Sequence, residues 1–357
     1  MAKEIFDLLL RVTRGRSGGY LASARAESPA ERFETGQEPL PALDPLRFAA
    51  LRSDLAARPG EAAERRFGAL LFDALFPGPL RELYSRWHDL ARARQTGVRL
   101  ALQIEPNELS SLPWEGLFNA EREVFMALSG QNTVFRYVGL GRPANRPRSL
   151  TLPLRVLALL ASPVNFPALD IERERTVLTE AFAPITAMGA AELIVMEHPS
   201  LEGLVEVLHQ NPVDIFYYQG HTGFDPDRSA SFLLLEGDQD LAIYKWVDLL
   251  SWTLERNSVS LAVINSEGMS SGNLAYEMVH AGFSSVVTNQ EPLTDRETLT
   301  FIRQFHLALA QGFAIDTALT QSRRAMFKEW SATARWASPL LVTRLPRPWL
   351  LTPEAVV

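Results

Sequence analysis

Residues 213–224 read VDIFYYQGHTGF, and residues 261–268 read LAVINSEG. Each segment begins with an apolar run and continues into glycine, as expected for a buried strand that ends at a turn. The first segment delivers His221, and the second delivers Ser266 and Glu267. Because the carboxyl ends of parallel strands meet at one edge of a sheet, we expect these side chains to lie together. A histidine at one strand tip beside a nucleophile at the next is the layout of a covalent hydrolase.

The chain around these two segments alternates strand and helix patterns from about residue 151 onward. This alternation predicts an α/β fold: a doubly wound, mainly parallel sheet with helices on both faces. Before it we expect a smaller mixed α+β subdomain. The proline-rich stretch GRPANRPRSLTLP (residues 141–153) is the predicted connector, which gives domains at residues 1–150 and 151–357.

The N-terminal subdomain has its own pattern. Residues 4–28 alternate apolar and polar around RGRSGG, which predicts a hairpin. Two helical patterns follow, separated by prolines. Their expected buried faces are Phe67, Leu70, Leu71 and Leu75 in the first, and Leu80, Leu83, Tyr84 and Trp87 in the second.

Composition excludes several classes of function. The chain has 357 residues, a formal net charge of −7 and no cysteine. The charge argues against a nucleic-acid partner, and the missing cysteine excludes disulfides, thiolate metal sites and a cysteine nucleophile. The histidines do not have metal-ligand spacing and no phosphate-binding loop is found, so we expect no metal and no cofactor. No apolar run is long enough for a membrane span and no secretory pattern is present, so we expect a cytoplasmic protein.

A set of ordered motifs resembles the CHAT domain, a branch of the caspase-like (clan CD) cysteine peptidases. LSSLPWEGLFN (residues 109–119) resembles the LPWE segment of that family, with Leu112, Pro113, Trp114 and Glu115 matching it residue by residue. The segments at 213–224 and 261–268, and the following stretch from AYEMVHAGF to AIDTAL, match in the same order. The resemblance extends over about residues 65–345. It implies a caspase-like sheet.

The resemblance also implies roles for the residues at the strand tips. In the family, a histidine and a cysteine form a dyad that cleaves peptide bonds. His221 stands at the histidine and Glu267 at the cysteine, and Thr222 replaces the second glycine of the family's glycine–histidine–glycine. Gly220 and Gly268 are the expected cleft residues beside them. A carboxylate is a poor nucleophile toward an amide, and it would stabilise a protonated imidazole, which makes a worse base.

Asp170 has both a structural and a functional interpretation, and Asp295 and Trp114 have a structural one. Asp170 is expected either to cap a helix or to bind a basic side chain in the cleft, and the cap is favoured. Asp295 is expected to cap the helix that directly follows it. Trp114 is expected to be a core anchor, because tryptophan buries a large area.

The leading hypothesis is a degenerate peptidase that binds a protein or peptide in a retained cleft. The family occurs in bacterial signalling, defence and cell-death systems, often attached to sensor domains. We expect no sensor domain within this sequence and therefore expect a separate partner, while the oligomeric state stays open. One alternative is an active endopeptidase that uses His221 with Ser266, or with a natural cysteine exchanged for Glu267. Another is a hydrolase of a different bond that uses Glu267 and His221 as an acid–base pair.

Overall fold

A computed structural model describes residues 6–16, 18–57, 59–130, 132–141, 151–268 and 272–351. The chain divides into two compact units. The first contains residues 1–139 together with 323–338, and the second contains residues 140–322 together with 339–357. The segment 323–338 therefore belongs with the N-terminal unit although it is far away in sequence. Most of the proline-rich connector falls outside the described residues.

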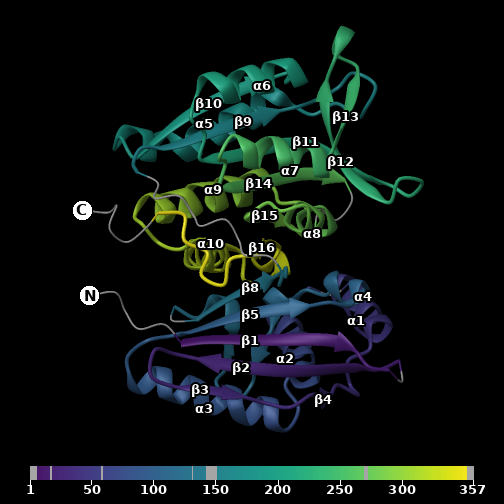
Figure 1. Ribbon diagram of the computed structural model, residues 1–357, viewed down its shortest axis with the longest axis vertical. Coiled ribbons are helices and arrows are strands. Elements are labelled where there is room, and N and C mark those ends of the chain that lie inside the picture. The colour runs from purple at the N-terminus through teal and green to yellow at the C-terminus, as the bar shows by residue number, and fades with distance from the viewer. Residues whose placement is uncertain are drawn as a thin grey trace. The chain divides into compact units, whose positions relative to one another are not determined.

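The first unit is a mixed sheet with helices packed on it (Figure 1). Its strands lie in the order β8-β5-β1-β2-β3. β8, β5 and β1 are parallel to one another, β2 is antiparallel to β1, and β3 is antiparallel to β2. The strands are β1 (Phe6–Arg14), β2 (Tyr20–Glu27), β3 (Arg32–Glu34), β5 (Val98–Ile104) and β8 (Thr133–Tyr137), with β4 (Glu38–Pro39) beside β2. The helices are α1 (Pro45–Ala57), α2 (Glu61–Leu75), α3 (Pro79–Ala93) and the short α4 (Asn107–Ser110). A small hairpin of β6 (Phe118–Asn119) and β7 (Val124–Phe125) and the 3₁₀ turns η1 (Trp114–Gly116), η2 (Met126–Leu128) and η4 (Ala334–Ala337) complete it.

The predicted hairpin and helices are confirmed in this unit. β1 and β2 are antiparallel from Asp7–Glu27 to Arg14–Tyr20, and α2 and α3 occupy the two helical patterns. Their expected faces are buried except for Leu70, which is exposed. Helix α1 was not predicted, because its sequence, PLRFAALRSDLAA, has only a weak apolar stripe. The helix buries Phe48.

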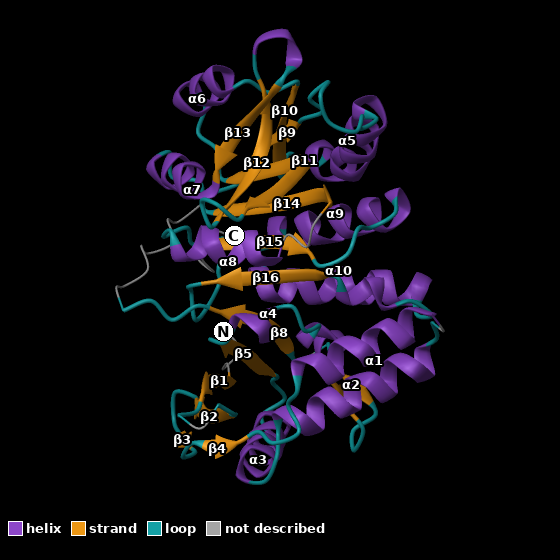
Figure 2. Cartoon of the chain, turned by 90° about the vertical axis from the view of Figure 1, so that its right-hand side faces the viewer, coloured by secondary structure: helices purple, strands orange, loops and turns teal. Residues whose placement is uncertain are grey.

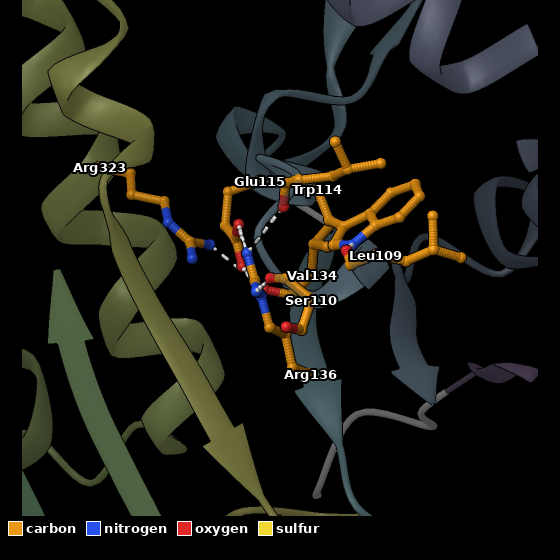
Figure 3. Close-up of polar contacts among 8 residues, drawn as sticks. Leu109, Ser110, Trp114, Glu115, Val134, Arg136 and Arg323 are labelled. Atoms are coloured by element: carbon orange, nitrogen blue, oxygen red, sulfur yellow. Dashed lines mark hydrogen bonds and ion pairs between the residues drawn. The ribbon is translucent and has the colours of Figure 1, made fainter. Parts of the chain in front are cut away.

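The LPWE motif forms a buried charge cluster in the first unit (Figure 3). Glu115 accepts two hydrogen bonds from the Arg136 guanidinium, at 2.9 and 2.7 Å, and both side chains are fully buried. Arg323 is equally buried and donates to the Val134 carbonyl at 3.3 Å. Burial lowers the pKa of Arg323 to about 10, against the opposing attraction of Glu115. Trp114 is fully buried, as expected of an anchor.

The second unit contains the two segments quoted first from the sequence, residues 213–224 and 261–268. Its strands lie in the order β10-β9-β11-β14-β15-β16, and all neighbours are parallel except β15 and β16. Their bounds are β9 (Leu154–Leu160), β10 (Ala191–Glu197), β11 (Ile215–Asp225), β14 (Leu261–Gly268), β15 (Ser285–Asn289) and β16 (Pro339–Thr343). β12 (Ala230–Glu236) pairs with β11, and β13 (Ala242–Trp246) pairs with β12, with the turn η3 (Asp238–Asp240) between them.

Helices cover both faces of this sheet (Figure 2). α5 (Ile171–Ala187) and α9 (Asp295–Ala310) lie on one face, while α6 (Leu201–Gln210), α7 (Val247–Arg256) and α8 (Gly272–His280) lie on the other. Helix α10 (Ile315–Trp330) begins in this unit, and its residues from Arg323 onward belong to the first. The expectation of an α/β fold with a largely parallel sheet, preceded by N-terminal strands, is confirmed. The strand β9 shows why: its run LRVLALL is buried along almost its whole length, as a central parallel strand requires.

Candidate functional site

The pairing of β11 with β14 brings the two predicted strand tips together. In this parallel register His221 is opposite Glu267, and Gly220 is opposite Ser266. Thr222 and Gly268 form the next pair. The sequence placed these residues at neighbouring strand tips, and the structure adds the main-chain register that pairs them.

Both strands are longer than their apolar runs predicted. The pairing of β11 with β9 ends at Gln219, but the strand continues to Asp225. Pairing with β12 begins at Thr222. His221 therefore does not follow the strand, as we expected, but lies within it, at the residue where β11 leaves one neighbour and gains another. The added pairing with β12 is what keeps this polar segment extended.

Ser266 lies on the opposite face of the sheet from His221. Successive residues of a strand point to opposite faces, so Ser266 shares a face with its partner Gly220, and position 267 shares a face with His221. The hydroxyl oxygen of Ser266 is buried and has no hydrogen-bond partner among the described residues. The expectation that the Glu267 carboxylate faces His221 lies outside the described part, because only the main chain of Glu267 is described.

The His221 ring is fixed by a main-chain carbonyl. Its Nε2 lies 2.7 Å from the carbonyl oxygen of Pro167. A carbonyl can only accept, so Nε2 carries a proton, and in the neutral ring Nδ1 is the nitrogen left to take up a proton. The ring of Phe166 lies beside the imidazole, with centroids 5.8 Å apart. A histidine oriented in this way is suited to act as a base at Nδ1.

The loop that carries Pro167 is anchored by a buried carboxylate. Glu236, at the end of β12, accepts from the Ser162 amide at 2.7 Å and lies 2.8 Å from Nδ1 of His198. The hydrogen bond to Glu236 raises the pKa of His198 above its usual value. Ser162 in turn accepts from the Leu169 amide at 2.9 Å. These contacts hold the loop on both sides of Pro167.

Tyr218 ties β11 to β12 behind His221. Its hydroxyl accepts from the Leu234 amide at 3.2 Å and lies 2.8 Å from two possible acceptors, the carbonyls of Leu234 and His221. Gly220 makes room for this contact, because a Cβ there would lie 2.4 Å from the Tyr218 hydroxyl. The glycine before His221 is thus required by close packing within β11.

A row of side-chain amides crosses the strand tips on the face of His221. Asn265 donates to Gln219 at 2.5 Å, and Asn289 donates to Asn265 at 3.0 Å. The three residues lie on adjacent strands, β11, β14 and β15, and Gln219 and Asn289 are buried. An amide can donate and accept at once, so such a row fixes the relative positions of the strands that it joins.

The two aspartates expected to be caps have different outcomes. Asp170 is the N-cap of α5, and its carboxylate accepts from the Arg173 amide at 3.0 Å. Asp295 does not cap α9. That helix is capped by Thr294, which forms a capping box with Glu297. Asp295 instead pairs with the Arg173 guanidinium. The prediction was wrong because threonine is also a preferred N-cap residue, and Glu297 three residues later completes a capping box with Thr294.

Three contributors to the site were not anticipated from the sequence. The Pro167 carbonyl gives no sequence signal, because every residue has one. Tyr218 was hidden in an apolar run, where a tyrosine resembles any other core residue. Glu236 had a detectable signal: a carboxylate that directly follows the apolar run SFLLL.

Comparison with known proteins identifies the family. Residues 65–344 match the CHAT domain. The search of curated proteins gave no significant match. Among solved structures, the chain is similar to one in the Saccharomyces cerevisiae separase–securin complex, with 11% identity and a TM-score of 0.47 over 94% of this chain and 30% of that chain. It is also similar to caspase-1 from Spodoptera frugiperda, with 12% identity and a TM-score of 0.37 over 60% of this chain and 96% of that one.

The described helices include none with both the length and the apolar character needed to cross a membrane. The family match covers well over half of the chain and includes the charge cluster of the LPWE motif and both strand tips. This chain belongs to the CHAT domain family, and it contains no cysteine.

Proposed function

We propose that this chain is a catalytically degenerate CHAT peptidase that binds a protein or peptide at the surface around His221 without cleaving it. One observation carries the proposal: the residue in register with His221 is Glu267, in a chain without cysteine. A carboxylate is a weak nucleophile toward an amide, and the anhydride that it would form is unstable. Its negative charge would also oppose the oxyanion that develops during amide cleavage.

The rest of the site supports binding. The loop at Pro167, the Tyr218 hydroxyl and the row of amides hold the strand tips in place without using position 267. The proposed setting, a bacterial signalling, defence or cell-death system, follows from the family. The alternative in which Ser266 is the nucleophile gains no support, because its buried hydroxyl lies on the other face of the sheet from His221.

A cleavage assay with matched variants tests this proposal. A tryptic digest of a cell lysate serves as the peptide mixture, and new termini are counted by mass spectrometry. We expect none with the wild-type chain and new termini with Glu267→Cys, because that variant restores the family nucleophile. The double variant Glu267→Cys/His221→Ala should lose them again. Cleavage by the wild-type chain that disappears in His221→Ala would show that the protein is an active hydrolase and would overturn the proposal.

A further inference from the structure

β13 forms an outer edge of the second unit. It pairs with β12, from Phe232–Trp246 to Glu236–Ala242, and within the described part of the chain it has no second neighbouring strand. In Figure 1 it lies at the side of the sheet, next to β12. An edge strand presents main-chain N–H and C=O groups on its free side, and these groups can accept another strand.

The register determines which residues of β13 face outward. The Gly237 amide donates to the Leu241 carbonyl at 2.8 Å, so this is a hydrogen-bonded pair of the antiparallel ladder. Such pairs alternate with non-bonded ones. Ile243 and Lys245 therefore point their main-chain groups toward β12, and Tyr244 points its N–H and C=O away from it.

Two independent contacts agree with this assignment. The Ala242 amide, which is outward by the same rule, donates to the side chain of Asn165 and not to β12. Leu234, the partner of Tyr244, uses its own N–H and C=O to contact the Tyr218 hydroxyl on the opposite side. Neither main-chain group of Tyr244 is therefore used by β12.

The side chains around Tyr244 form a partly exposed aromatic surface. Tyr244 is 46% exposed. Its ring centroid lies 4.7 Å from that of Phe232, 6.3 Å from that of Trp246 and 6.4 Å from that of Phe166. Phe166 also contacts His221, so this surface continues to the candidate site. A side chain added above Tyr244 would be stabilised by apolar and aromatic contacts.

The other face of β13 carries a cation. Lys245 is half-buried, and no ion pair to it occurs among the described residues. Burial lowers the pKa of Lys245, against the opposing attraction of Asp248. Its neighbour Ile243 is 37% exposed. A carboxylate brought next to Lys245 would compensate for this loss of hydration.

We propose that β13 binds an extended segment of another protein as an added β-strand. The segment would hydrogen-bond to Tyr244 through its main chain, place an apolar or aromatic side chain on the Tyr244 surface and place an acidic side chain beside Lys245. The proposal deepens the proposed function, because it names how the ligand of this domain is held and what sequence it has.

A second copy of this chain suits the edge less well. If two β13 strands paired antiparallel about Tyr244, each Lys245 would lie opposite an Ile243 of the other copy. The two lysines would then be diagonal neighbours on one face, about 7–8 Å apart. Like charges at this distance repel, whereas an acidic segment is attracted.

Peptide selection supplies the probe for a test. A phage-displayed library of random peptides is selected on the full chain, and synthetic copies of the enriched peptides are titrated by fluorescence anisotropy. We expect apolar and acidic residues to alternate in them. Tyr244→Pro, which removes the outward N–H, should weaken binding at least roughly tenfold, and Tyr244→Ala, which keeps that N–H, should weaken it less. Bound peptide should also slow hydrogen exchange of the Tyr244 amide.

Proline placement provides the folding control. Tyr244→Pro should leave the urea midpoint nearly unchanged, because its N–H faces away from β12, and Ile243→Pro should lower it. If Tyr244→Pro fails to fold, the enriched peptide is methylated at one main-chain nitrogen at a time. Loss of binding at alternate positions supports strand addition, and uniform tolerance overturns it.

The outcomes separate this proposal from the proposed function. Equal affinity for the wild-type chain and Tyr244→Pro, or no enrichment at all, would overturn docking on β13. Binding that is lost only in His221→Ala would overturn it too, while leaving a non-cleaving site at His221 intact. Cleavage of the enriched peptides would overturn the proposed function and would not contradict strand addition to β13. Analytical ultracentrifugation tests for self-association. If the wild-type chain is a dimer and Tyr244→Pro is a monomer, β13 binds a second copy of this chain and not another protein.

Discussion

Glu267 is the register partner of His221 across the parallel strands β11 and β14. This pairing predicts that a thiol at position 267, and not one at 266, is activated by the histidine. Glu267→Cys should react with iodoacetamide at pH 7 about ten times faster than Glu267→Cys/His221→Ala, because a neighbouring imidazolium favours the thiolate.

Ser266→Cys is the matched control, because its side chain replaces a buried hydroxyl on the other face. Its alkylation should be slow and should not change when His221 is replaced. The pairing would be contradicted if the thiol at 266 responded to His221 and the thiol at 267 did not.

Gly220→Ala should destabilise the second unit by about 1–3 kcal/mol. The added methyl group would lie 2.4 Å from the Tyr218 hydroxyl oxygen and 3.1 Å from the Ala161 carbonyl oxygen, so the strand or the ring has to move. Urea denaturation followed by circular dichroism measures the loss. Gly141→Ala is the control, because no atom of the residues that the structure describes lies within 4 Å of the added carbon. Similar midpoints for the two variants would show that β11 tolerates the extra volume.

Glu115→Gln should destabilise the first unit by about 3–5 kcal/mol, because it leaves the buried Arg136 without its counter-charge. The effect is measured by urea denaturation. Glu61→Gln removes the same charge from the exposed pair Glu61–Arg65, whose atoms are 2.6 Å apart, and should cost about 0.5 kcal/mol or less. Equal losses of unfolding free energy in the two variants would mean that burial does not strengthen the Glu115–Arg136 pair.

His306 should make the protein less stable as the pH falls below about 6.5. Its burial lowers the pKa to about 4. The unfolded chain, in which histidine titrates near its ordinary value of about 6.5, therefore takes up the proton first. A folded-state pKa below the unfolded one means that stability is complete above the unfolded value and is lost as the pH falls toward 4. At pH 5 the loss should be about 2 kcal/mol.

His306→Phe isolates this effect, because phenylalanine fits the same aromatic surroundings of Phe182 and Phe305 and does not titrate. The free energy of unfolding is compared between pH 7.5 and pH 5 for both proteins. The wild-type chain should lose more of it than the variant. Parallel losses would show that His306 is not neutral and buried in solution.

The sequence predicted the architecture because its signals were local and periodic. The run LRVLALL requires a strand buried on both faces, and the position of His221 after a similar run placed it near the edge of the sheet. What could not be predicted depends on contacts between distant residues. Arg136 meets Glu115 across 21 residues and Pro167 meets His221 across 54, and nothing in either local segment indicates its partner.

The register was the main addition to the candidate site. Shifting one strand by a single residue would have placed Ser266 beside His221, and the sequences of β11 and β14 are both apolar enough to accept either alignment. The polar residues Gln219 and Asn265 favour the observed one, because only this register allows their amides to bond.

The row formed by Gln219, Asn265 and Asn289 holds the strands of this domain together independently of the residue at position 267. It joins three neighbouring strands through side-chain hydrogen bonds that do not involve position 267. A lineage can therefore exchange the residue at position 267 without disturbing the frame around it. Under the proposed function, the exchange at position 267 removes the nucleophile and leaves these three strands joined as before.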